Sequence, residues 1–242
     1  MIDLIFIIPY RNREQHKSYF DRHMKYILED EKNYDIIFVH QKDNRLFNRG
    51  AMKNIGFIYA KEKYPDNYKE ITFVFNDIDT LPYKKNLLNY RTKKNIIKHF
   101  YGFEFCLGGI FSITGYDFEK VNGFPCFWNW GLEDNSIYLR ALEKKIKVDR
   151  STFYRLGDMN ILHLIDGLTK LANKRKLTYK ELKNVNDGYK EISNISYTLN
   201  KDMLDVENFD CNTLNIEPLK LEIGKLNNQL KIKPKPLLGR MF

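Results

Sequence analysis

The strongest constraint on the fold is a short apolar run that ends in two carboxylates. Residues 71–75 are β-branched and aromatic, which predicts a buried strand. Asp77 and Asp79 follow at its carboxyl end, the edge at which open α/β sheets hold ligands. Because side chains two residues apart in an extended segment point the same way, both carboxylates can face one divalent cation. A polar turn that closes the strand is the alternative, since Asn and Asp are common turn residues.

Strands and helices alternate through the first half of the chain. Residues 4–8 predict a first strand that Pro9 ends, and the next segment has apolar residues at helical spacing as far as Leu28. Residues 36–39 predict a second strand, and Asn48 can cap the helix that follows it. This alternation predicts parallel pairing with right-handed crossovers, and therefore a doubly wound sheet.

The second half of the chain is less regular. Residues 84–100 are basic and polar, which predicts a surface excursion, and residues 108–113 predict a strand that begins with two glycines. An aromatic loop then leads to a helix that begins near Glu133 and to a strand over residues 146–148. Weaker signals predict a helix over residues 179–182 and an extended segment over residues 195–199. We expect one domain over residues 1–217 and a basic, proline-containing tail over residues 218–242.

Composition excludes several classes of protein. A chain of 242 residues with 43% hydrophobic residues can bury one substantial core. It has no apolar run long enough to span a membrane and no signal peptide, so we expect a cytoplasmic protein. The scattered Cys106, Cys126 and Cys211 argue against a disulfide framework and a zinc site. A net charge of +9 suggests an anionic partner, which nucleic acid, a membrane surface or a nucleotide would satisfy.

Basic and aromatic side chains follow the first predicted strand. Arg11 and Arg13 can bind a diphosphate, and Tyr10 can stack on a base. A solvated basic turn that begins the next helix is the alternative. The pattern alone leaves both interpretations open.

A second group of functional side chains lies in residues 128–135, which combine two tryptophans with Glu133 and Asp134. Aromatic faces pack on sugar rings, and a neighbouring carboxylate can accept a hydroxyl proton as a general base. Capping of a helix start is the alternative, and the helix dipole there would keep Asp134 ionised, so the two interpretations are compatible. His163 could add an imidazole to a metal held by Asp79, although a lone histidine is more often structural.

Taken in order, these segments resemble the β-1,4-galactosyltransferase family of inverting, metal-dependent sugar transferases. The matching pieces are IIPYRNRE, FNRGAMKNIGF, FVFNDID, GGIFSIT, NGFP and WNWGLED, followed by NDGY, and they extend over residues 7–189. The resemblance implies an α/β fold of GT-A type, in which helices flank a Rossmann-like central sheet that is mixed but mostly parallel. It also implies a single catalytic domain, here residues 1–217.

The resemblance implies a role for each matched residue. Asp134 would be the catalytic base, and Glu133 beside it would hold the acceptor. Asp79 would ligate the metal together with His163 and Asn160, where Asn160 stands in place of a Met or His that is common in the family. Mn²⁺ is the expected cofactor, with Mg²⁺ as the alternative because an amide carbonyl is a harder ligand than a thioether. The implied donor-binding set is Pro9, Tyr10, Arg11, Arg13, Phe47, Arg49, Asp77, Cys106, Gly109 and Trp130.

The implied reaction is the inverting transfer of a hexose or N-acetylhexosamine from a UDP-sugar to a hydroxyl of a glycan or glycosylated protein. Galactose and N-acetylgalactosamine are the favoured sugars, because Cys106 is smaller than the tyrosine usual at this position and would admit an N-acetyl group. A cytoplasmic location without the family's membrane anchor suggests a bacterial or large-virus origin. The rival hypotheses are a basic nucleic-acid-binding protein and a sugar-binding module of the same fold without catalysis, although we expect no nucleic-acid partner.

Overall fold

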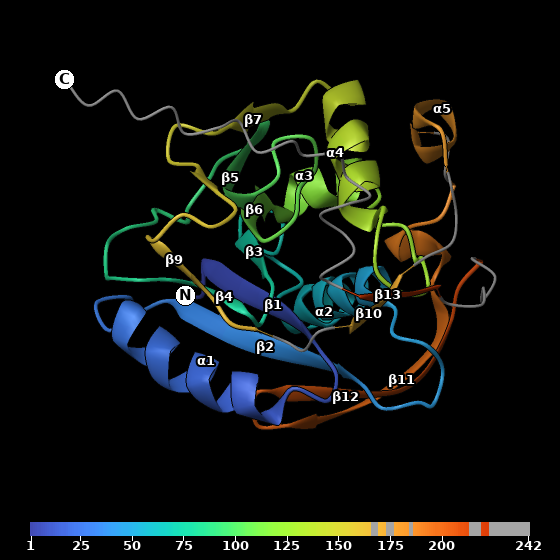
Figure 1. The fold of residues 1–242 in the computed structure, drawn as a ribbon, viewed down its shortest axis with the longest axis horizontal. Coiled ribbons are helices and arrows are strands. Elements are labelled where there is room, and N and C mark those ends of the chain that lie inside the picture. The colour runs from blue at the N-terminus through green and yellow to red at the C-terminus, as the bar shows by residue number, and fades with distance from the viewer. Residues whose placement is uncertain (166–168, 173–176, 184–185, 213–218, 223–242) are drawn as a thin grey trace.

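A central mixed sheet forms the middle layer of the molecule (Figure 1). The computed structural model describes residues 1–165, 169–172, 177–183, 186–212 and 219–222. The strand order is β11 (Ser193–Asn200), β12 (Met203–Asp210), β2 (Tyr34–Gln41), β1 (Leu4–Tyr10), β3 (Thr72–Asn76), β6 (Ile110–Thr114), β5 (Ile96–Gly102) and β7 (Lys147–Asp149), and β8 (Tyr154–Arg155) also pairs with β5.

Parallel pairing predominates in this sheet. The strands from β12 through β2 and β1 to β3 are parallel, as are the pairs of β5 with β7 and β8. The pairs β11–β12, β3–β6 and β5–β6 are antiparallel. Two small antiparallel ladders lie apart from it among the described residues: β4 (Thr80–Pro82) with β9 (Ile161–His163), and β10 (Thr169–Ala172) with β13 (Leu219–Glu222).

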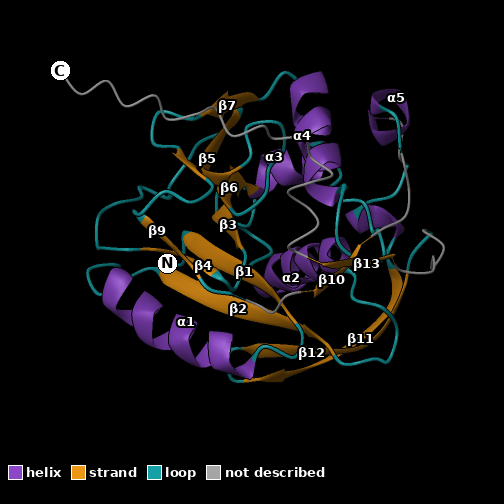
Figure 2. Cartoon of the chain, in the orientation of Figure 1, coloured by secondary structure: helices purple, strands orange, loops and turns teal. Residues whose placement is uncertain are grey.

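Helices cover both faces of the sheet (Figure 2). One face carries α1 (Glu14–Ile27), and the other carries α2 (Arg49–Lys63), α3 (Gly115–Lys120) and α4 (Glu133–Glu143). Strand β1 contributes to both cores, because Phe6 and Ile8 pack with α1 while Ile5 and Ile7 pack with α2. Helix α5 (Tyr179–Lys183) and the 3₁₀ helix η1 (Tyr189–Glu191) follow later in the chain. The predicted fold class, a mostly parallel Rossmann-like sheet flanked by helices, is confirmed.

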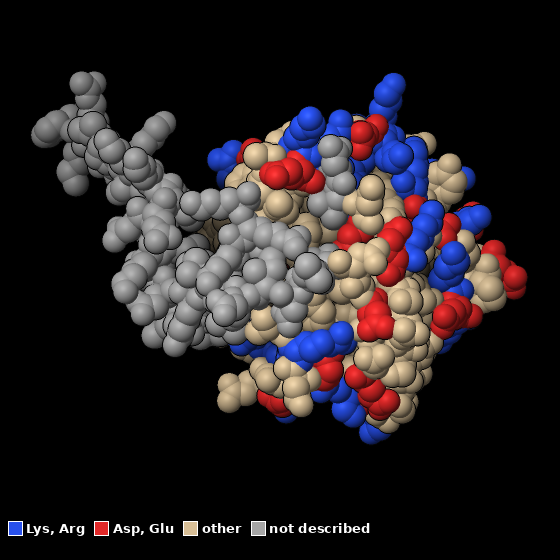
Figure 3. Space-filling view, turned by 90° about the vertical axis from the view of Figure 1, so that its right-hand side faces the viewer, with Lys and Arg blue, Asp and Glu red and all other residues tan. Residues whose placement is uncertain are grey.

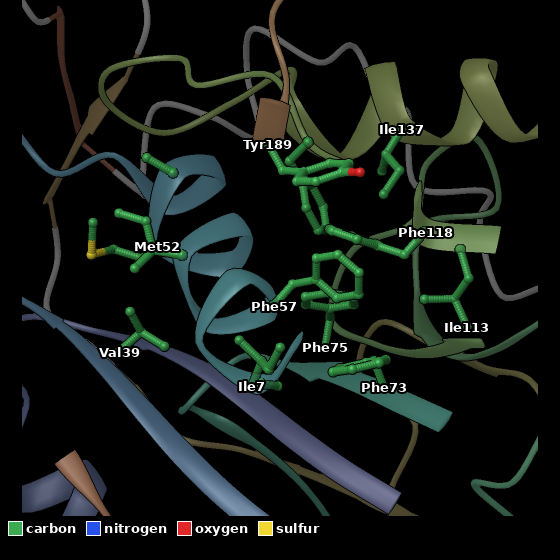
Figure 4. Packing of buried hydrophobic residues seen from close by; sticks show 14 of the residues in the cluster. Ile7, Val39, Met52, Phe57, Phe73, Phe75, Ile113, Phe118, Ile137 and Tyr189 are labelled. Atoms are coloured by element: carbon green, nitrogen blue, oxygen red, sulfur yellow. The ribbon is translucent and has the colours of Figure 1, made fainter. Parts of the chain in front are cut away.

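Aromatic side chains fix helix α2 on the sheet (Figure 4). The ring of Phe57 lies 5.0 Å from that of Phe73 and 4.5 Å from that of Phe118, centroid to centroid. At its start, the side chain of Asn48 accepts a hydrogen bond from the amide of Ala51, as the sequence predicts. A helix held at its cap and along its apolar face presents its remaining side chains in fixed positions.

Two predicted boundaries are wrong. Strand β1 continues through Pro9 to Tyr10. Its pairing with β3 ends at Ile7, so that pairing does not need the backbone N–H that Pro9 lacks. Residues 84–100 are more than a surface excursion, since they include the start of β5, in which Ile97 and Phe100 are buried. The polar residues that precede β5 conceal its apolar pattern.

Helix α4 buries both apolar and charged side chains. Ile137, Ala141 and the charged Arg140 are buried, whereas Leu142 is 43% exposed. The guanidinium of Arg140 donates to the carbonyl of Gly123 at 2.7 Å, which compensates its burial.

The basic tail predicted for residues 218–242 lies outside the described residues, except for Leu219–Glu222, which form β13. Among the described residues, no helix combines the length and the apolar character needed to cross a membrane. On the face shown in Figure 3, basic side chains are interspersed with acidic ones. Surface ion pairs such as Lys63 with Asp35, 2.8 Å apart, are consistent with this mixture.

Candidate active site

The turn after β3 holds both carboxylates of the Asp77 and Asp79 pair. The amide of Asp77 donates to the carbonyl of Gly109 at 3.0 Å, and the side chain of Asn76 donates to the carbonyl of Thr80 at 2.8 Å. These bonds fix the backbone on either side of the pair. The turn is therefore a rigid support for two carboxylates at the carboxyl edge of the sheet.

Five charged side chains meet between this turn, α2 and the start of α4. Asp77 bonds to the guanidinium of Arg49 at 2.5 Å, and Nε of Arg49 lies 3.5 Å from Oε1 of Glu133. One turn along α2, Nζ of Lys53 lies 3.0 Å from Oδ1 of Asp134 and 3.9 Å from Oδ1 of Asp77. We call these five residues the charge cluster. It connects Asp77, which is predicted to bind the donor, to Asp134, the predicted base.

Burial and mutual charge shift two groups of the cluster. Burial acts to lower the pKa of Arg49, but the charges of Asp77, Glu133 and Asp134 raise that pKa well above its ordinary value. Burial raises the pKa of Glu133, and the charge of Asp134 raises it further, against the opposing effects of Arg49 and Lys53. The cluster is thus a set of strongly interacting charges, as is common at catalytic sites. Lys53 and Glu133 are buried, whereas Arg49, Asp77 and Asp134 are partly exposed.

The predicted base lies against a glycine. A Cβ atom on Gly108 would lie 2.9 Å from Oδ2 of Asp134, so any larger residue there would push the carboxylate out of its present position. The amide of Leu107 donates to the backbone carbonyl of Asp134 at 3.0 Å, which ties the start of α4 to the same segment. Gly109 has φ of +71°, and a Cβ there would lie 2.4 Å from the carbonyl of Tyr101. Gly108 therefore leaves room beside Asp134, and Gly109 allows the chain to pass close to the backbone of Tyr101.

Asp79 and His163 come together across the ladder of β4 and β9. Thr80 pairs with His163, the amide of Leu164 donates to the carbonyl of Asp79 at 2.7 Å, and Oδ2 of Asp79 lies 3.8 Å from Nε2 of His163. One ion could contact both atoms, because metal bonds to oxygen and nitrogen ligands are about 2.0–2.6 Å long. The hydroxyl oxygen of Tyr101 lies 3.1 Å from Nδ1 of His163. In the histidine tautomer whose Nδ1–H donates to this hydroxyl, Nε2 carries the lone pair that a metal ion needs.

Asn160 is not brought to this pair. It lies beyond the other end of the β4–β9 ladder, where its carbonyl accepts from the amide of Tyr83 at 2.8 Å and its side-chain amide donates to Asp158. The antiparallel register places it opposite Tyr83 rather than beside Thr80, so this geometry does not support its predicted role as a ligand, which stays a prediction. Among the described residues, no group of three or more His, Cys, Asp and Glu side chains could hold an ion. Two protein ligands with substrate oxygens are nevertheless a common arrangement for metals that bind phosphates.

Four of the expected donor-binding residues, Pro9, Tyr10, Arg11 and Arg13, lie at or just after the carboxyl end of β1. The guanidinium of Arg11 donates to the backbone carbonyls of Arg45 and Asp43, so it fixes the loop before α2. The ring of Tyr10 is buried edge-to-face on His40, 5.0 Å away, so its face is not presented for stacking on a base. Pro9 is buried, whereas Arg13 is partly exposed at the start of α1.

The aromatic loop contacts the same region. The amide of Asn129 donates to the carbonyl of Phe47 at 2.9 Å, and Trp130 is partly buried immediately before α4. Cys106 is only 6% exposed, and burial raises the pKa of its thiol to about 12, with the charge of Asp134 adding to the effect. Cys106 therefore lies close to the predicted base.

Sequence reasoning missed three residues that build the site, namely Lys53, Tyr101 and Gly108. A signal for Lys53 was present, because Arg49 and Lys53 are four residues apart in a predicted helix and must share a face. Tyr101 lay in a strand that was not predicted. Gly108 was noted only as half of a glycine pair.

A buried histidine supports the glycine pair and gives a testable pH dependence. His99 is 1% exposed, its Nε2 lies 3.1 Å from the carbonyls of both Tyr101 and Gly108, and its Nδ1 accepts from Arg150. Burial, with a smaller effect of Arg150, lowers the pKa of His99 from 6.5 to about 4. Between these values the unfolded chain binds the proton and the folded protein does not, so stability falls as the pH falls.

We expect the free energy of unfolding to drop by about 2 kcal/mol between about pH 7.5 and about pH 5 through His99 alone. Urea unfolding of the wild type and of His99→Gln at both pH values measures this difference. Glutamine can still donate to a carbonyl and accept from Arg150, but it does not titrate, so its pH dependence should be weaker by that amount. An equal pH dependence in both proteins would exclude the effect, and His16→Gln is a surface control.

Comparison with known proteins shows to which family the chain belongs. The model for the N-terminal region of glycosyl transferase group 7 matches residues 2–92, and that for the N-terminal domain of galactosyltransferase matches residues 94–163. A xylosylprotein 4-β-galactosyltransferase of Caenorhabditis elegans is 30% identical over 191 residues, which are 75% of this chain and 63% of that protein. The chain belongs to the β-1,4-galactosyltransferase family.

Other members of the β-1,4-galactosyltransferase family are similar over a shorter range. Human β-1,4-galactosyltransferase 4 is 31% identical over 157 residues, which cover 60% of this chain and 44% of that enzyme. The chain thus spans about half to two thirds of the length of these curated relatives. The two matched ranges include the whole charge cluster, Asp79 and His163.

Solved structures share the fold. The catalytic domain of Drosophila β1,4-galactosyltransferase 7, in complex with xylobiose, superimposes with a TM-score of 0.65 at 20% identity, over 88% of this chain and 96% of that one. A mutant of the same Drosophila enzyme, solved with manganese, UDP-Gal and xylobiose, gives the same values. These likenesses confirm the GT-A type of fold.

Proposed function

We propose that the chain is an inverting glycosyltransferase that moves galactose or N-acetylgalactosamine from a UDP-sugar to a hydroxyl of a glycan, with Asp134 as the general base. One observation carries this proposal: the charge cluster joins Asp134 to Asp77, next to the Asp79 and His163 pair. A base and a candidate metal pair thus lie at the same edge of the sheet in a chain of the galactosyltransferase family.

The residues divide the reaction between them. The acceptor oxygen attacks the anomeric carbon and gives its proton to the carboxylate of Asp134, while the bond from that carbon to the diphosphate breaks and UDP leaves with the electron pair. Asp79 and His163 would hold Mn²⁺, or Mg²⁺ in its place, and a bound ion would neutralise the charge of the departing diphosphate. Glu133, whose Oε1 lies 3.5 Å from Nε of Arg49, precedes the base in the chain and would hold the acceptor.

A donor screen with the purified protein tests the proposal. UDP-galactose, UDP-N-acetylgalactosamine, UDP-glucose and UDP-xylose would each be supplied with Mn²⁺ or Mg²⁺, with xylobiose among the acceptors because a Drosophila relative binds it. We expect release of UDP from one or both favoured donors and a product of increased mass. Absence of UDP binding with either metal would contradict the proposal.

The choice of sugar is proposed to depend on Cys106. A tyrosine at this buried position would take the space that an N-acetyl group needs, so Cys106→Tyr should reduce the rate with UDP-N-acetylgalactosamine relative to UDP-galactose by about 10-fold or more. The ratio of kcat/KM for the two donors within each protein measures this, and any general loss of activity cancels in the ratio. Cys106→Ala keeps the space and is the control. An unchanged ratio in Cys106→Tyr would remove Cys106 from the donor site.

A further inference from the structure

We propose that Lys53 is the positioning residue of the base: its ammonium holds Oδ1 of Asp134 and thereby leaves Oδ2 to take the acceptor proton. This inference rests on the proposed function, because it assigns Asp134 to proton transfer. It adds a residue on α2 that itself touches neither donor nor acceptor in the proposed reaction.

The position of Lys53 is unusual for a lysine. Its side chain is 2% exposed, its Nζ lies 3.0 Å from Oδ1 of Asp134, and the same atom lies 4.6 Å from the centre of the Phe124 ring. Lysine is rarely buried completely unless it is paired, because loss of hydration of the ammonium is costly. The carboxylate of Asp134, the more distant carboxylate of Asp77 at 3.9 Å and the aromatic face together compensate this cost. The shortest of these contacts places the ammonium on the side of Asp134 that carries Oδ1.

The backbone beneath Lys53 is fixed as well. The neighbouring Asn54 donates to the carbonyl of Phe124 at 2.8 Å and accepts from its amide at 2.9 Å. These two bonds attach α2 to the loop that precedes α4. Lys53 is thus held by the helix and by its neighbour, as a residue that sets the direction of another side chain must be.

The two oxygens of Asp134 have different surroundings. Oδ1 accepts the hydrogen bond from Lys53, whereas Oδ2 faces Gly108, which has no side chain to fill the space. A carboxylate with one oxygen held by a cation turns less freely, and a misplacement of about 1 Å can cost about 10²-fold in rate. The geometry therefore selects Oδ2 as the oxygen that meets the acceptor.

Lys53 also balances the charge of the cluster. Asp77, Glu133 and Asp134 face two cations, Arg49 and Lys53, and without Lys53 the guanidinium alone would face three carboxylates. Removal of Lys53 would leave Oδ1 of Asp134 without its cationic donor and increase the repulsion among the three carboxylates, which would disturb the orientation of the base. Arg49 keeps its own bond to Asp77, so the donor side should be less affected than the base.

The alternative is that Lys53 only stabilises the fold as a buried ion pair, whose removal would lower stability without a specific effect on turnover. Lys53→Met, which keeps the length but removes the charge, separates these roles. We expect kcat to fall by about 10- to 100-fold while the KM for the donor and the affinity for UDP change by less than about threefold. Lys53→Arg, which retains a cationic donor, should recover part of kcat.

Lys61→Met is the matched control, because it makes the same substitution on the same helix and removes the ion pair of Lys61 with Glu119 away from the cluster. It should leave kcat unchanged. Thermal unfolding of each variant identifies effects that come from stability. If Lys53→Met does not fold, Lys53→Leu replaces it, since leucine also has no donor for Oδ1. A wild-type kcat in the folded Met or Leu variant would overturn the proposal.

The double variant Lys53→Met with Asp134→Asn distinguishes failure of this inference from failure of the proposed function. If Lys53 acts through the base, the double variant should be no slower than Asp134→Asn alone, because positioning has no effect once the base is absent. A further loss in the double variant would mean that Lys53 acts elsewhere. A fully active Asp134→Asn protein would instead overturn the assignment of the base.

Discussion

Asp134→Asn should lower kcat by about 10²- to 10⁴-fold, the usual contribution of a positioned general base, while UDP and Mn²⁺ still bind. Asparagine has the same shape as aspartate, and its carbonyl can still accept a hydrogen bond from Lys53. It cannot accept the acceptor proton. Initial rates at saturating donor and acceptor, together with calorimetric titration of UDP in the presence of Mn²⁺, measure the two expectations separately.

A control for this prediction is Asp35→Asn, which removes a carboxylate that pairs with Lys63 at the surface. It should retain wild-type turnover. Normal turnover by Asp134→Asn would show that the acceptor proton leaves by another route. A loss of both turnover and UDP binding would indicate that the substitution disturbs the whole charge cluster rather than the base.

Asp79→Ala should abolish most of the stimulation of activity by Mn²⁺, with a loss of more than about 100-fold at moderate metal concentration. The structure offers two side chains for the ion, Asp79 and His163, so removal of one leaves a single protein ligand. Loss of an outer partner of a metal ligand alone typically costs about 10- to 100-fold in affinity or activity, and loss of the ligand itself should cost more. Activity as a function of Mn²⁺ concentration measures the effect.

Tyr101→Phe provides a graded comparison for Asp79→Ala, because it removes only the hydroxyl beside Nδ1 of His163. We expect its Mn²⁺ affinity to fall by about 10-fold, which is less than the loss in Asp79→Ala. Far-ultraviolet circular dichroism of both variants tests the fold. A Mn²⁺ dependence in Asp79→Ala equal to that of the wild type would exclude the Asp79 and His163 pair as the metal site.

Much of the fold follows from local patterns in the sequence. The strand before Asp77 and the cap at Asn48 are set by short stretches of chain, and both are where the sequence predicts them. Strand β5 was missed because Lys93, Lys94 and Asn95 mask its beginning. Its position depends on pairing with β6 and β7, which the local sequence does not specify.

The candidate site was predictable where its residues follow strands and less so where it depends on register. Asp77, Asp79 and Asp134 could be identified as carboxylates at element ends. The place of Asn160 depends on the register of the β4–β9 ladder: because Thr80 pairs with His163, Asn160 lies opposite Tyr83 at the other end of the ladder. Lys53 was missed because its role requires the start of α4 to lie beside α2, a contact between distant segments.

The ladder of β4 and β9 has a consequence for the behaviour of the protein before any chemistry occurs. It pairs only three residues on each strand and lies apart from the central sheet, yet its register brings Asp79 and His163 together. An ion bound to both side chains would act as a cross-link between segments far apart in the sequence. It would stabilise this small ladder against local opening much more than the central sheet, so that the donor would meet a locally more rigid protein once the metal is bound.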